Sequence, residues 1–281
     1  MIGQKKNFNP GKNTARCKMI SWQNVSKKFL TPDGQNELSV IEDVSLIAQN
    51  NEFLSLVGPS GCGKSTLLNI VAGLEMPSSG SIIYKGEKID GINRDVGYMT
   101  QKDTLLPWKT AAENIAIPLK IRGLSRADCD DQVNHYLNLV GLDSFSNYYP
   151  GQLSGGMRKR VALARTLIYK PNTLLMDEPF GALDVQIRLL MQKELARVLE
   201  SESGISSKTV IFVTHDLREA IALSDRVVVF SARPAKIILD KRIGFSRPRD
   251  PMGVQFLPEF EDYYRELWKA LEGEVGKGTD A

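Results

Sequence analysis

The sequence is poor in cysteine and histidine, with three cysteines and two histidines among 281 residues. Cys17, Cys62 and Cys129 lie far apart and are odd in number, so we expect neither a disulfide framework nor a metal-binding cysteine knuckle. Such cysteine usage is typical of the reduced cytosol. The sequence also has no apolar run of about 18 residues, and the polar, basic stretch up to Arg16 lacks the apolar centre of a secretory signal. If the protein works at a membrane, we expect another chain to hold it there.

Neither sign of charge is in large excess. The formal net charge is +3, which does not by itself indicate a nucleic-acid-binding surface. Hydrophobic residues make up 42% of the chain and charged residues 25%, which is ordinary for a globular protein. A chain of this length can bury a substantial core in one or two domains.

One glycine-rich stretch dominates the sequence. It reads Gly58-Pro59-Ser60-Gly61-Cys62-Gly63-Lys64-Ser65-Thr66 and matches the G-x-x-x-x-G-K-[ST] phosphate loop. The apolar residues 53–57 before it predict a buried strand, and residues 66–72 after it predict a helix. Glycines let backbone N–H groups approach an anion that the helix dipole also favours, so we expect the whole stretch to bind ATP. Lys64 would reach the β- and γ-phosphates, and the Ser65 hydroxyl would hold Mg²⁺. A flexible turn with a solvated lysine is the alternative.

An acidic pair follows another apolar stretch, residues 173–176. Asp177 would leave the end of a buried strand and supply a second hard oxygen ligand to Mg²⁺. Glu178 would act on the attacking water as a general base. The alternative is an acidic turn that faces solvent at the end of a strand.

The remaining elements predict an α/β fold. Residues 19–25 alternate like an exposed edge strand and form a predicted hairpin with residues 38–48. Further strands are expected at 81–84, 95–99, 173–177, 209–214 and 226–230, with a long helix near 186–201. Continuous apolar strands that alternate with helices indicate a mostly parallel sheet covered on both faces.

The domain organisation follows from changes along the chain. Residues 1–16 are expected to be a mobile tail, and residues 17–245 a P-loop ATPase core that begins with antiparallel strands. Within the core, residues 102–165 are predicted to form an inserted helical subdomain with helices at 111–121 and 127–140. Residues 246–281 form an extension, in which Phe260, Tyr264, Leu267 and Leu271 share one face of an amphipathic helix that would pack on the core.

The order of the motifs resembles that of ATP-binding-cassette (ABC) ATPases over residues 19–240. The phosphate loop is followed by Gln101, the Ser154-Gly155-Gly156 motif, the Asp177-Glu178 pair, Asp184 and His215. The specific member is Ser154-Gly155-Gly156, which other phosphate-loop ATPases lack. Read alone, this motif is an ordinary helix cap, with Ser154 at the cap position.

The resemblance implies a role for each of these residues. The subunit should form a head-to-tail dimer with a second copy or a homologous ATPase subunit. Each ATP should then contact Ser154, Gly155 and Gly156 of the opposite copy, and Asp184 should act across the dimer, although by itself it could equally cap the helix that follows. Gln101 resembles the residue that contacts Mg²⁺ or water, and His215 the residue that senses the γ-phosphate.

At three positions the residue is not the one that is commonest in the family. Phe29 matches the aromatic residue on which adenine stacks, where tyrosine is commoner, and a core phenylalanine is the alternative. Met157 replaces a frequent glutamine, which puts one polar contact across the interface in doubt. Lys159 also stands where glutamine is frequent, and the sequence offers no physical reason for it.

Other segments resemble the nitrate, sulfonate and taurine branch of importers: residues 101–108, 180–184 and 231–234. This implies separate transmembrane permease subunits, which would dock around Leu105, Leu106 and Trp108, and indirectly an external solute-binding protein. The ATPase would be a peripheral protein on the cytoplasmic face of the inner membrane. Packing of these three side chains within the helical insert is the alternative reading. A soluble ABC ATPase of nucleic acid or ribosomes is the competing function, but we expect no nucleic-acid partner, since neither two cassettes nor basic stripes occur.

Overall fold

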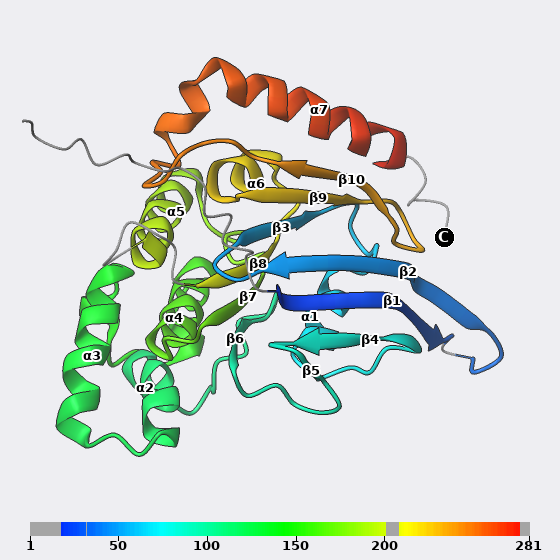
Figure 1. Ribbon diagram of the computed structural model, residues 1–281. Coiled ribbons are helices and arrows are strands. Elements are labelled where there is room, and N and C mark those ends of the chain that lie inside the picture. Colours follow the sequence, from blue (N-terminus) through cyan, green and yellow to red (C-terminus); the bar gives the residue numbers. More distant parts are fainter. Residues whose placement is uncertain (1–17, 32, 201–207, 276–281) are drawn as a thin grey trace, which may run out of the picture.

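The computed structural model describes residues 18–31, 33–200 and 208–275. The tail expected at residues 1–16 lies outside these residues, as does Ser201 at the end of the expected long helix. The strands form two sheets (Figure 1), one of four strands in the order β2-β1-β4-β5 and one of six in the order β10-β9-β3-β8-β7-β6. Within the described ranges, no helix combines the length and apolar character needed to cross a membrane.

The six-stranded sheet forms the centre of the molecule. Its strands are β3 (Phe53–Val57), β6 (Val96–Met99), β7 (Thr173–Asp177), β8 (Thr209–Val213), β9 (Arg226–Phe230) and β10 (Ile237–Arg242). The first five pair in parallel, and β10 is antiparallel to β9. Every residue of β3, β7 and β8 is buried, because both faces of the sheet are covered. The mostly parallel sheet predicted from the sequence is thus confirmed.

The four-stranded sheet is antiparallel. Its strands are β1 (Lys18–Leu30), β2 (Glu37–Gln49), β4 (Ser79–Tyr84) and β5 (Glu87–Lys88), and the β1–β2 hairpin is as predicted. The prediction that residues 19–25 form an exposed edge strand is wrong. β1 lies between β2 and β4, and its Ile20 and Trp22 are buried. The alternation of apolar and polar residues along a strand indicates which face of that strand is covered. It does not indicate whether a strand distant in the sequence pairs with the free edge of the hairpin.

The helical insert shares its core with the sheet. Its helices are α2 (Ala111–Ile121), α3 (Arg126–Leu139) and α4 (Gly155–Ile168), with the short 3₁₀ turns η1 (Asp143–Phe145) and η2 (Pro150–Gln152) between the last two. Helix α2 starts with a capping box between Thr110 and Glu113, which satisfies N–H groups that the helix itself leaves open. One continuous apolar cluster runs from Val133 of α3 to Phe212 of β8. Figure 1 shows α2 and α3 on the side of the molecule away from the four-stranded sheet.

The remaining helices cover the six-stranded sheet. They are α1 (Lys64–Val71), α5 (Val185–Glu200), α6 (Leu217–Leu223) and α7 (Pro258–Val275), with a 3₁₀ turn η3 (Gly253–Phe256) before α7. Helix α7 lies along β9 and β10 (Figure 1) and buries Phe260, Leu267 and Leu271 against α6 and the sheet. Tyr264 is half-buried on the same face. The predicted packing of this amphipathic helix on the core is confirmed.

Candidate functional site

The phosphate loop lies at the carboxyl end of β3, directly before α1. Two of its glycines are required by space and backbone conformation. A Cβ atom at Gly58 would lie 2.9 Å from the Phe230 carbonyl oxygen, and one at Gly63 would lie 2.9 Å from a methyl carbon of Val40. Gly63 also has a φ of 118°, which side chains of L-residues rarely allow. The loop is therefore held tightly between β9 and β2.

Lys64 is the first residue of α1 and is buried. Its Nζ donates to the Gly58 and Pro59 carbonyl oxygens, each at 2.8 Å, so the ammonium group lies across the loop. The first turn of α1 contains no acidic side chain, and the cap position is a glycine. The positive end of the helix dipole and the ammonium group therefore favour an anion at the same place.

Asp177 ends β7 and is 2% exposed. Burial raises the pKa of its carboxyl group, while a hydrogen bond with the Ser65 side chain acts in the opposite direction. Its Oδ1 atom has no hydrogen-bond partner although it is buried. An unpaired buried carboxylate oxygen beside a hydroxyl fits a hard cation such as Mg²⁺.

The number of protein ligands also fits Mg²⁺. Mg²⁺ is commonly held by one or two protein oxygens, with water and substrate phosphates as the other ligands. Ser65 and Asp177 match that arrangement.

Glu178 lies between two polar side chains from neighbouring strand ends. The Gln101 amide Nε2 donates to its Oε2 at 3.3 Å, and the His215 Nδ1 lies 3.5 Å from its Oε1. The backbone N–H of Glu178 donates to the Val213 carbonyl at 2.9 Å, which holds the residue at a φ of 47°. Because β6, β7 and β8 are adjacent and parallel, their carboxyl ends bring Gln101, Glu178 and His215 to one edge.

Ser154 caps α4, as predicted: its hydroxyl accepts from the Met157 N–H at 3.2 Å. Gly155 and Gly156 form the first turn of the helix. The sequence left open whether Asp184 caps the helix that follows. The structure shows that it does, because its carboxylate accepts from the Ile187 N–H at 3.0 Å at the start of α5. Both helix starts are thus capped by side chains of the same chain.

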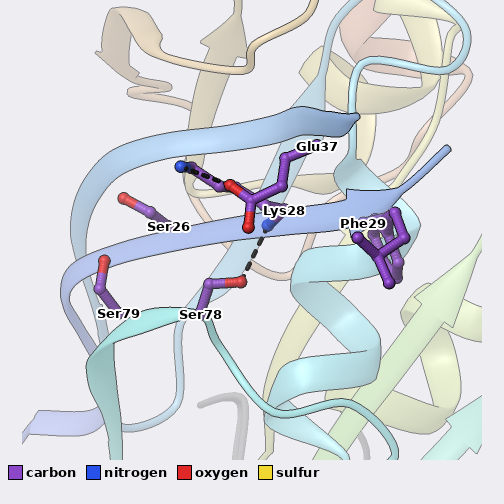
Figure 2. Close-up of a pocket in the computed structure, with 7 residues that line it drawn as sticks. Ser26, Lys28, Phe29, Glu37, Ser78 and Ser79 are labelled. Atoms are coloured by element: carbon purple, nitrogen blue, oxygen red, sulfur yellow. Dashed lines mark hydrogen bonds and ion pairs between the residues drawn. The ribbon is translucent and has the colours of Figure 1, made fainter. Parts of the chain in front are cut away.

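Phe29 is half-buried near the end of β1 and packs against the core cluster, with the Lys27 ammonium 4.7 Å from its ring centre. It helps to line a hollow of about 340 Å³, and Figure 2 shows its ring apart from the Lys28–Glu37 pair in the same hollow. The residues that line this hollow do not belong to the phosphate loop. The core packing of Phe29 was an open alternative, and the structure supports it in part.

Sequence reasoning missed a set of cations on α4. The buried Lys159 ammonium donates to the backbone carbonyl of Gln101, and Arg158 pairs with the Asp103 carboxylate at 2.9 Å. Arg165 donates to the backbone oxygens of Asp103 and Thr104. Burial lowers the pKa of Lys159. Together these side chains hold residues 101–104, the segment that follows β6. The contact with Gln101 is a physical reason for a lysine at position 159. The sequence signal that could have revealed these contacts was a basic residue on the buried side of a predicted helix.

The expected docking residues differ in exposure. Trp108 is 69% exposed, whereas Leu105 is buried in the insert and Leu106 is half-buried. Leu105 therefore packs within the protein, as the alternative reading held. Trp108 remains available on the surface.

The chain is similar to known proteins over most of its length. Residues 41–181 match the family described as ABC transporter. An uncharacterized ABC transporter ATP-binding protein of Methanocaldococcus jannaschii is 42% identical over 86% of this chain and 88% of its own length. The taurine import ATP-binding protein TauB of Roseobacter denitrificans is 40% identical over 93% of this chain and 98% of its own.

Two further relatives and one solved structure extend the comparison. The aliphatic sulfonates import ATP-binding protein SsuB of Bacillus cereus is 40% identical over 84% of this chain and 91% of its own. The nitrate import ATP-binding protein NrtD of Synechococcus elongatus is 41% identical over 88% of this chain and 89% of its own. A dimeric ATP-binding cassette solved with ADP and Pi is 31% identical, with a TM-score of 0.73 over 81% of this chain and all of that chain.

Proposed function

Because this chain belongs to the ABC transporter family and has the fold of its ATP-binding cassettes, we propose that it is the ATP-hydrolysing subunit of an importer. The observation that carries the proposal is the grouping of three residues at the carboxyl ends of the parallel strands of the six-stranded sheet: Lys64 follows β3, Asp177 ends β7 and Glu178 comes directly after it. A phosphate-binding loop, an unpaired carboxylate oxygen and a candidate base occur together there. These are the parts that phosphoryl transfer to water requires.

The phosphate loop, residues 58–66, would bind the ATP phosphates through its backbone N–H groups and Lys64. Ser65 and Asp177 are the residues that would hold Mg²⁺, and the side-chain oxygen of Gln101 would be a further ligand. The ion would offset the charge of the phosphates. Phe29 would stack on adenine through its aromatic ring.

Glu178 would accept a proton from the attacking water as the water oxygen bonds to the γ-phosphorus. The bond from that phosphorus to the β,γ-bridging oxygen breaks, and ADP is the leaving group. Gln101 and His215 contact opposite oxygens of the Glu178 carboxylate, so they would keep it aimed at the water. His215 is 59% exposed at its side chain, which leaves it free to contact the γ-phosphate as well.

A second copy, or a homologous subunit, would complete the site. Ser154, Gly155 and Gly156 form a helix start without acidic side chains, which suits a γ-phosphate from the opposite copy. Asp184 would act across the same interface while it caps α5. The solved cassette with ADP and Pi is dimeric, which supports this arrangement.

Permease subunits would dock on the insert around the exposed Trp108, since an exposed large aromatic side chain suits a protein interface. The relatives are named as import ATP-binding proteins for taurine, aliphatic sulfonates and nitrate, so a small anion of this kind is the proposed solute. An external binding protein would deliver it. The ATPase would then lie on the cytoplasmic face of the cell membrane as a peripheral subunit.

The test is to purify the tagged full chain from detergent-extracted membranes of its source organism and to identify the proteins that accompany it. We expect membrane permeases at a fixed ratio, and reconstituted vesicles that import nitrate, taurine or a sulfonate only with ATP. A complex that carries Glu178→Gln provides the control without hydrolysis. Recovery without any membrane protein, together with ATPase activity stimulated by DNA or ribosomes, would contradict the proposal.

A further inference from the structure

The connection between β9 and β10, residues 231–236, joins three parts of the molecule. The Ala235 N–H donates to the Val40 carbonyl at 2.9 Å, and the Glu42 N–H donates to the Ala235 carbonyl at 3.2 Å. These two bonds attach the connection to β2. Val40 is also the residue that packs against Gly63 of the phosphate loop. The connection therefore lies directly beside the loop.

Arg233 extends from this connection onto the phosphate loop itself. Its guanidinium donates to the Gly61 carbonyl oxygen from both Nε and Nη2, at 3.2 and 2.9 Å. Gly61 has a φ of 73°, a left-handed conformation that glycine adopts much more readily than residues with a Cβ atom. A loop that binds anions through N–H groups must keep its carbonyl oxygens turned away from the anion. Two hydrogen bonds from the exposed Arg233 side chain would hold the Gly61 oxygen turned away from a bound anion.

Glu274 fixes the residue before Arg233. Its Oε2 accepts from the Ala232 N–H at 2.9 Å, although the two residues are 42 positions apart. Glu274 lies in the last turn of α7, which is anchored on α6 and the sheet by Phe260 and Leu267. Figure 1 shows this end of α7 on the same side as the β9–β10 connection. A continuous path of bonded groups thus leads from α7 to the phosphate loop.

We infer that Arg233 is a positioning residue for the phosphate loop, and that the last turn of α7 controls it through Glu274. This gives the C-terminal extension a function in nucleotide binding, beyond packing on the core. The inference rests on the proposed role of the loop in ATP binding. A purely structural role would change the stability of the protein and leave its affinity for ATP unchanged.

The experiment measures equilibrium affinity for a fluorescent ATP analogue, KM, kcat and urea unfolding in the full chain. Arg233→Ala should weaken nucleotide binding about 3- to 10-fold, with kcat at saturation within about two-fold of the wild type. Arg233→Lys, which retains one donor, should recover part of the affinity. Arg242→Ala removes an exposed arginine of β10 and serves as the matched control, with unchanged affinity.

Glu274 is tested in the same assay. Glu274→Ala should weaken binding about two- to three-fold, whereas Glu274→Gln retains an acceptor oxygen and should bind like the wild type. The matched control is Glu272→Ala, at an exposed position of the same helix. Because the two groups act through one path, the double variant of Arg233→Ala and Glu274→Ala should bind no more weakly than Arg233→Ala alone.

Failure of the inference can be told apart from failure of the proposed function. If Arg233→Ala binds ATP normally while Lys64→Ala does not, the loop binds nucleotide and the positioning role is wrong. The role is also wrong if Arg233→Ala lowers only the free energy of unfolding, or if the effects of Arg233→Ala and Glu274→Ala are additive. If Lys64→Ala binds normally, the loop is not the nucleotide site.

Discussion

The Gln101 side-chain amide donates to the Glu178 carboxylate at 3.3 Å, although 77 positions separate the two residues. The other carboxylate oxygen faces His215 at 3.5 Å. Contacts on both oxygens restrict rotation of the carboxylate, so Glu178 has a defined direction. A defined direction is what a general base needs, because proton transfer depends on alignment with the attacking water.

Glu178→Gln should slow ATP hydrolysis by on the order of 10²- to 10⁴-fold, because the amide cannot accept the proton of the attacking water. ATP should still bind, since the phosphate loop is unchanged. The measurement is phosphate release together with affinity for a fluorescent ATP analogue. Hydrolysis at a rate close to that of the wild type would remove Glu178 from the proposed role.

Lys64→Ala should weaken ATP binding at least about ten-fold, because hydrogen bonds from a charged group to phosphate are lost in a buried place. The affinity assay for the same analogue measures the change. Lys88→Ala, at an exposed position of β5, is the control for loss of one positive charge. Equal affinities of the Lys64 and Lys88 variants would contradict the phosphate-loop assignment.

Lys159→Met should lower kcat several-fold, on the order of 3- to 30-fold, because the Gln101 backbone carbonyl loses its donor and the side-chain amide is no longer held near Glu178. Lys159→Gln retains a donor and should be much closer to the wild type. Steady-state kinetics and urea unfolding of both variants make the comparison. If both variants lose the same activity, or neither does, the contact with Gln101 does not position the site.

Trp108→Ala should impair assembly with the permeases and leave the ATPase activity of the separate subunit unchanged, because the side chain is 69% exposed and lies outside the nucleotide site. Trp268→Ala is the matched control, since that tryptophan is 48% exposed on α7. Co-purification from membranes reports assembly. Normal recovery of permeases with the Trp108 variant would place the docking surface elsewhere.

The buried Glu219 should make the free energy of unfolding depend on pH. Burial raises its pKa above the ordinary value of 4.5, as does the Asp216 charge, while the hydrogen bond from Thr214 and the charges of Arg188 and His215 act in the other direction. The folded protein therefore binds this proton more tightly than the unfolded chain. The resulting stability is fully present below the ordinary value and is lost as pH rises through the folded-state pKa.

The check is urea unfolding of the wild type and Glu219→Gln over a pH series that starts near 4.5 and extends to neutral pH. The free energy of unfolding of the wild type should fall relative to that of the variant as pH rises. Curves that stay parallel over the whole series would show that the pKa of Glu219 is the same in both states.

Local sequence signals located much of the fold and of the candidate site. Strands β7 and β9 begin and end where their apolar runs predicted, because a buried strand needs continuous apolar residues and polar turns at its ends. The phosphate loop was recognisable because its glycines, lysine and hydroxyl residues act together within nine positions, residues 58–66. The cap at Ser154 is likewise local.

The tertiary structure alone decided the properties that depend on distant partners. β1 became an interior strand because β4 pairs with its free edge, and Leu105 became buried because the helices of the insert close over it. The contact of Lys159 with Gln101 and the contact of Arg233 with Gly61 join segments 58 and 172 positions apart. A sequence can specify which groups a site contains, but only the packing of strands and helices determines which of those groups meet.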